Sequence, residues 1–256
     1  MLAGLGAATA FNAVLRGGEA LQDRFAARRD VAADIARFRE RAPQVKDVDA
    51  LLKDQRTLRT VLEAFQLETE IGKTAILRRL LTEQPGAEGT LSTRLTDQRW
   101  RRFAETFGGT GVAALSNPAT IDRLAADAVT NRFEKAMGDA NPGLREALYF
   151  RRLAADVTSV AQLMADRAML EVTRGALGLP AQFGLLDYDQ QRERVAKRLD
   201  VADLKDPRKV DRLVQRYLLQ VAPATGASNP APSLPGGGGN TASLASLPRG
   251  RFSFSI

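Results

Sequence analysis

Two aspartates, Asp54 and Asp166, are the residues whose type and spacing are best suited to chemistry. A symmetric pair of carboxylates could bind a divalent cation or share a proton. A buried carboxylate can instead serve packing, and it then needs a cationic partner, such as Arg94 or Arg99 in the case of Asp54. We interpret Asp54 and Asp166 as a structural polar pair, and we predict no catalytic, cofactor-binding or metal-binding residue.

The two aspartates occupy equivalent places in an internal repeat. Residues 38–67 and 150–179 align without a gap at an offset of 112, with ten identities in thirty positions. The match continues at Gly72 and Gly184, and at an offset of 114 it pairs Asp97, Arg102 and Phe103 with Asp211, Arg216 and Tyr217. Amphipathic repeats rarely bury their apolar faces alone. We therefore expect two tandem pseudo-symmetric units, about residues 36–107 and 148–218, packed around one core.

The apolar residues have helical spacing through most of the chain, and no alternating run indicates a strand. The predicted fold is therefore all-α. Asp47 and Ser159 are predicted N-caps, and Pro142 and Pro207 fit first-turn positions. The expected helices cover residues 25–42, 47–65, 71–81, 91–107, 118–137, 142–157, 159–177, 188–199 and 207–219.

The two ends of the chain differ from this helical domain, which we place at residues 18–221. Residues 1–17 are predicted to be a mobile segment. Residues 222–256 are rich in Pro, Gly, Ser and Ala and are predicted to be a disordered tail. The tail ends in a short aromatic segment that could add as a strand to the sheet edge of a partner protein. Its candidate partner-binding residues are Arg249, Arg251, Phe252, Phe254 and Ile256; the alternative is a terminus without function.

Composition excludes several classes of protein. The chain contains neither cysteine nor histidine, which excludes disulfides, the usual zinc sites and Ser-His or Cys-His catalysis. The formal net charge is +7, but acids and bases alternate along the predicted helices. No apolar run is long enough to span a bilayer, and the first fifteen residues lack the positive charge of a secretory signal. We expect a cytoplasmic protein.

Several segments resemble a proteobacterial family of helical proteins of unknown function. They include residues 34–41 (DIARFRER), 51–54 (LLKD), 61–67 (VLEAFQL), 95–100 (LTDQRW) with Phe103 and Phe107, 148–151 (LYFR) and 177–179 (LGL). Genes of that family are often found among flagellar genes, and some members are described as flagellar proteins. The resemblance covers roughly residues 20–220. It implies an α-helical fold and a flagellar association, and it carries over no active-site residue. The chain departs from the family at Gln66, where Gly is more common, and in its tail.

Three functions follow from these observations. The first is a non-enzymatic, flagellum-associated structural, assembly or chaperone-like protein that acts through protein–protein contacts and needs no cofactor. The alternative is a helical nucleic-acid-binding module driven by the basic charge. The third is an enzyme or metal site that uses Asp54 and Asp166.

Overall fold

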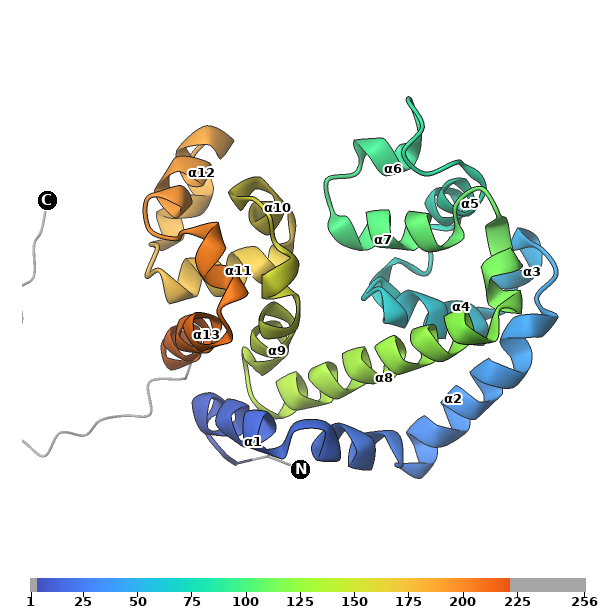
Figure 1. The fold of residues 1–256 in the computed structure, drawn as a ribbon, viewed down its shortest axis with the longest axis horizontal. Helices are drawn as coiled ribbons and strands as arrows, with labels where there is room; N and C mark the ends of the chain where they lie inside the picture. Colours follow the sequence, from blue (N-terminus) through green and yellow to red (C-terminus); the bar gives the residue numbers. More distant parts are fainter. Residues whose placement is uncertain (1–3, 222–256) are drawn as a thin grey trace, which may run out of the picture. The chain divides into compact units, whose positions relative to one another are not determined.

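The computed structural model describes residues 4–221, and every regular element in this range is a helix (Figure 1). The predicted all-α fold is confirmed for these residues. The predicted tail and its candidate residues Arg249, Arg251, Phe252, Phe254 and Ile256 lie outside the described residues. None of the described helices combines the length and the apolar character that crossing a bilayer requires.

The described chain forms the following helices in order. The first half contains α1 (Ala7–Ala26), α2 (Arg29–Arg41), η1 (Ala42–Gln44), α3 (Val48–Lys53), α4 (Gln55–Ala64), η2 (Glu68–Glu70), α5 (Thr74–Thr82), α6 (Leu91–Arg94), α7 (Gln98–Phe107), η3 (Gly111–Ser116) and α8 (Pro118–Ala140), where η marks a 3-10 helix. The second half contains α9 (Leu144–Leu153), η4 (Ala154–Asp156), α10 (Val160–Ala165), α11 (Arg167–Ala176), η5 (Ala181–Leu185), α12 (Tyr188–Ala196), η6 (Val201–Lys205) and α13 (Pro207–Val221).

Most of the predicted mobile segment, residues 1–17, is helical in the part that the structure describes. Residues 7–17 form the first part of α1, which packs on α9 and α13, and the side chain of Phe11 is fully buried. Gln215 Nε2 donates a hydrogen bond to Asn12 Oδ1 at 3.2 Å. The prediction of mobility is wrong for residues 7–17, because the spacing of their apolar residues creates one buried helix face.

The aligned segments 38–67 and 150–179 form the same elements with the same bounds. α3 and α10 correspond residue for residue at the offset of 112, and so do α4 and α11. The two central helices also end alike, because Gln66 (φ 57°) and Gly178 (φ 60°) both adopt the left-handed conformation that commonly closes a helix. The first unit thus carries a non-glycine residue in a backbone conformation that favours glycine.

Each central helix is covered by one long helix, and these covering helices correspond at a different offset. α4 packs mainly on α8, and α11 mainly on α13. Pro118 and Pro207 begin the two covering helices, which sets an offset of 89 (207 minus 118). At this same offset, Asp122 and Asp211 accept hydrogen bonds from the equivalent arginines Arg39 (2.9 Å) and Arg151 (2.8 Å).

These contacts correct the predicted pairing of Asp97 with Asp211 at an offset of 114. Asp97 is the N-cap of α7, whereas Asp211 lies inside α13. The covering helix of the first unit is therefore α8 rather than α7, and that unit extends past the predicted boundary at residue 107. The change of offset from 112 to 89 corresponds to 23 additional residues in the first unit, the region that contains α6 and α7.

The inserted helix α7 contributes aromatic side chains to the core of the first unit. Phe65, directly after α4, meets Phe103 and Phe107 edge to face, with ring centroids 5.4 and 6.2 Å apart. Phe103 and Phe107 are fully buried. Such pairs contribute about 0.5–1.5 kcal/mol beyond the burial of their surface, so the insertion is part of the core.

Replacement of Phe11 by Ala tests whether the N-terminal segment packs on the domain. Because the ring is fully buried, we expect Phe11→Ala to lower the free energy of unfolding by about 3–5 kcal/mol in urea denaturation. Arg16→Ala, at an exposed position of the same helix, is the matched control and should change it by less than about 0.5 kcal/mol. Equal, small effects of both variants would show that the segment is mobile after all.

Candidate functional site

Asp54 and Asp166 each lie at a break between two helices. The sequence predicts single helices over 47–65 and 159–177, but the structure interrupts them at these aspartates, between α3 and α4 and between α10 and α11. Asp54 and Asp166 are the N-caps of α4 and α11. The predicted N-caps Asp47 and Ser159 are confirmed for α3 and α10. Apolar periodicity missed the two breaks because the stripe continues on the same side across each of them.

The carboxylate of Asp54 accepts hydrogen bonds from three groups. They are the backbone N–H of Thr57 (3.1 Å), the Thr57 hydroxyl (2.9 Å) and Nε of Arg41 (3.1 Å). Partial burial raises the pKa of Asp54, but the bonds from Thr57 and Arg41 outweigh this and hold the pKa below its ordinary value. The partner of Asp54 is therefore Arg41, the last residue of α2, and neither of the predicted partners Arg94 and Arg99.

Asp166 is buried and has a different set of partners. Its Oδ1 accepts from the backbone N–H groups of Ala168 (2.9 Å) and Met169 (3.1 Å), and its Oδ2 accepts from the hydroxyl of Tyr149. Burial, followed by the charge and the hydrogen bond of Asp166, raises the pKa of Tyr149 well above its ordinary value. Arg99, a predicted partner of Asp54, donates its hydrogen bonds to Asp97 and to the carbonyl oxygen of Gln66.

The two aspartates do not share a ligand site in the described structure. Asp54 lines one cavity and Asp166 another, and their hydrogen bonds have no residue in common. Within residues 4–221, no group of three or more acidic side chains is placed to hold a metal ion. The geometry thus assigns both carboxylates to the start of a helix.

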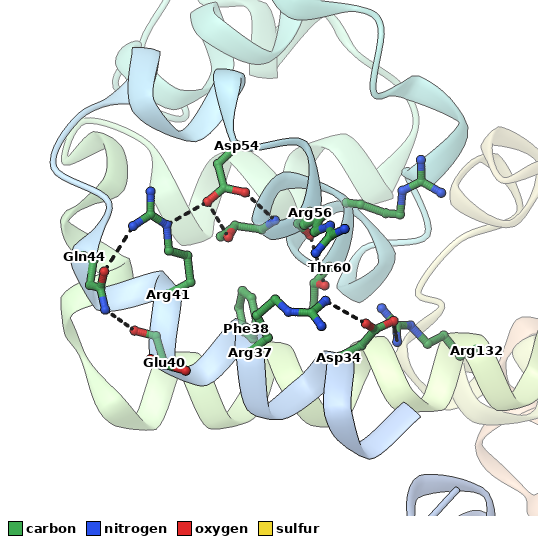
Figure 2. Close-up of a pocket in the computed structure, with 12 residues that line it drawn as sticks. Asp34, Arg37, Phe38, Glu40, Arg41, Gln44, Asp54, Arg56, Thr60 and Arg132 are labelled. Carbon is green, nitrogen blue, oxygen red and sulfur yellow. Dashed lines mark hydrogen bonds and ion pairs between the residues drawn. The ribbon is translucent and has the colours of Figure 1, made fainter. Parts of the chain in front are cut away.

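The cavity beside Asp54 is an arginine-lined groove that the sequence analysis did not single out. It has a volume of about 530 Å³ and lies between α2 and α4, with Arg132 of α8 at one end (Figure 2). We call it the basic groove. Its five arginines are Arg37, Arg41, Arg56, Arg59 and Arg132, and its three carboxylates are Asp34, Glu40 and Asp54.

Helical spacing brings these arginines together. Arg37 and Arg41 are four residues apart on α2, and Arg56 and Arg59 are three apart on α4, so each pair lies on one helix face. This spacing is readable from the sequence, but the approach of α2 to α4 is not. The sequence therefore shows two pairs of arginines, but only the tertiary contact between α2 and α4 shows that the pairs face the same groove.

Three of the five arginines are held by partners. Arg41 bonds to Asp54 and to Gln44 Oε1 (3.1 Å), and Arg37 donates to Asp34 Oδ1 (3.2 Å) (Figure 2). Arg132 donates to Glu63 Oε2 at 2.8 Å. The exposed guanidinium groups of Arg56 and Arg59 form no ion pair or hydrogen bond with a described residue. The groove therefore combines three arginines that are held in place with two whose donors are unoccupied.

Removal of each aspartate side chain tests its role as a cap. Asp166→Ala removes the cap and leaves the buried Tyr149 hydroxyl without its acceptor, so we expect a loss of about 2–4 kcal/mol in the free energy of unfolding. Asp54→Ala removes a more exposed cap and should cost about 1–2 kcal/mol. Urea denaturation measures both. Losses below about 0.5 kcal/mol would contradict the assignment.

The buried hydroxyl of Tyr149 predicts a loss of stability at high pH. Because its pKa is raised in the folded state, its contribution is complete below the unfolded pKa of about 10 and is lost as the pH rises above that value. Tyr149→Phe should lower stability at neutral pH but make the decline between about pH 9 and 11 shallower. Tyr188→Phe, at an exposed tyrosine, should leave the profile unchanged. Parallel profiles for Tyr149→Phe and the unmodified protein would argue against this effect.

The similarities of the chain to known proteins concern its family and its fold. No match is found among curated proteins. The X-ray crystal structure of a protein from Agrobacterium tumefaciens, a structural genomics target, is similar with a TM-score of 0.73 and 29% sequence identity. The similarity covers 83% of this chain and 91% of that protein. Residues 64–210, more than half of the chain, match the family described as proteins of unknown function, DUF1217. The chain belongs to the DUF1217 family.

Proposed function

We propose that this protein is a non-enzymatic, flagellum-associated protein that acts through protein–protein contacts, in structure, assembly or chaperoning. The observation that carries the proposal is the basic groove between α2 and α4, with its five arginines. Guanidinium groups remain protonated at any physiological pH and bind anionic groups through several donors. The groove is thus equipped to bind a partner.

The chemistry of the groove favours binding over catalysis. A general acid or base near neutral pH needs a pKa close to the pH at which it works. Arginine does not meet this condition, and the lowered pKa of Asp54 makes its carboxylate a weak base. Because Asp54 and Asp166 also cap α4 and α11, their recurrence in the repeat has a structural explanation. The enzyme reading therefore has less support.

The flagellar part of the proposal rests on the resemblance of residues 20–220 to a family whose genes lie among flagellar genes. The tail ending in Phe252, Phe254 and Ile256 adds a second candidate contact to the proposal. Nucleic-acid binding has less support from the groove, because three carboxylates interrupt its arginines, whereas a run of phosphates is best met by a continuous basic surface.

Deletion of the gene tests the flagellar association. We expect fewer or no flagellar filaments in electron micrographs and reduced swimming in soft agar, because a missing assembly protein interrupts the structure that depends on it. Complementation with the full-length gene should restore both. Complementation with a gene truncated after Val221 tests whether flagellar assembly requires the tail. Unchanged filaments and swimming after deletion would end the flagellar proposal.

A further inference from the structure

We propose that the basic groove between α2 and α4 binds the carboxylates of an acidic segment of a partner protein. The proposal rests on the proposed action through protein–protein contacts, and it names the site and the chemistry of one such contact. It is carried by a comparison within the chain itself, since the two units place equivalent residues on equivalent helices.

The second unit builds the same helix pair with no arginine at the positions equivalent to the groove arginines of α2 and α4. α9 and α11 stand where α2 and α4 stand in the first unit, and they also pack on each other. At the offset of 112, the groove residues Arg37, Arg41, Arg56, Arg59, Thr57 and Thr60 correspond to Tyr149, Leu153, Ala168, Glu171, Met169 and Val172. Three of these counterparts, Tyr149, Met169 and Val172, are buried. The equivalent place in the second unit is a cavity of about 380 Å³ that lacks the basic character of the groove, because five carboxylates and three arginines line it.

This difference indicates that the fold does not require the groove arginines. The identities shared by the two units include core positions such as Phe38 and Phe150, and Leu51 and Leu163, all of them buried. The groove arginines are not among the shared positions. The shared arginine, Arg39 in the first unit and Arg151 in the second, lies outside the groove and bonds to α8 or α13. Packing of the helix pair therefore does not need Arg56 or Arg59, and binding explains why the first unit carries them.

The arrangement of charge favours carboxylates as the ligand. Arg37, Arg41 and Arg132 are oriented by Asp34, Asp54 and Glu63, which reduces the side-chain entropy lost on binding. Arg56 and Arg59 supply the unpaired donors, in a fork geometry that matches a carboxylate. Five arginines against three carboxylates leave a modest excess of two positive charges in the groove. A short run of glutamates or aspartates meets that excess, whereas a polyphosphate chain needs a continuous basic surface.

The chain supplies its own test variant. Arg56→Ala combined with Arg59→Glu installs on α4 the residues that α11 carries at the equivalent positions, Ala168 and Glu171. Because Arg56 and Arg59 are exposed, the variant should keep the circular dichroism spectrum and the urea midpoint of the unmodified protein. If it does not fold, Arg56→Gln with Arg59→Gln removes the charges while keeping side chains of similar length.

The measurement is the fluorescence anisotropy of a labelled oligoglutamate peptide titrated with the full-length protein. We expect saturable binding that the double variant weakens about tenfold or more, because charge-assisted hydrogen bonds are lost. The matched control is Arg194→Ala combined with Arg208→Glu, which makes the same change of charge at exposed positions on α12 and α13. It should alter the affinity by less than about twofold, because we expect binding to depend on the charges in the groove and not on the net charge of the protein.

Other outcomes overturn the proposal. Absence of saturable binding, or equal weakening by both double variants, would show that the groove is not the site. Tighter binding of a labelled single-stranded DNA that depends on Arg56 and Arg59 would assign the groove to nucleic acid instead. None of these results depends on the deletion phenotype, so failure of the groove and failure of the flagellar proposal are distinguishable.

Discussion

Capping of the two central helices is the interaction on which the rest of the structure depends. The first N–H groups of a helix have no partner within it, and a side-chain acceptor must satisfy them where water is excluded. Asp54 and Asp166 do this for α4 and α11, after a break of one residue in the preceding helix. Each central helix then packs mainly on its covering helix, α4 on α8 and α11 on α13. Both units therefore carry a carboxylate at this position because a helix must begin there.

The two units then surround the same cap with different chemistry. Asp166 is buried and accepts a hydrogen bond from the Tyr149 hydroxyl, at a cavity lined by more carboxylates than arginines. Asp54 bonds to Arg41 at the edge of a groove that is open to a ligand. The difference is possible because an N-cap carboxylate accepts the backbone hydrogen bonds of its helix equally well when it is buried and when it is partly exposed. A repeated scaffold can therefore keep its fold in both units while one of them acquires a binding surface.

A polar network joins the units through α8. Glu134 of α8 is buried, and a buried carboxylate needs compensating partners. It accepts hydrogen bonds from Gln66 of the first unit (2.9 Å) and from Arg152 of the second (2.7 Å). Gln66 tolerates a left-handed backbone where glycine would be less strained, and its side-chain amide supplies a donor that glycine lacks. The contact with Glu134 accounts for a glutamine at this position of the repeat.

Local patterns in the sequence determined the helical class, the repeat of residues 38–67 in 150–179, and the caps at Asp47 and Ser159, because each depends on neighbours a few residues apart. The breaks at Asp54 and Asp166 were not predicted, since the apolar stripe continues across them. The burial of Phe11, the correspondence of α8 with α13, and the gathering of arginines from α2, α4 and α8 are contacts between distant segments. Only the tertiary structure decided these, because periodicity shows which face of a helix is apolar or charged but not which other helix that face meets.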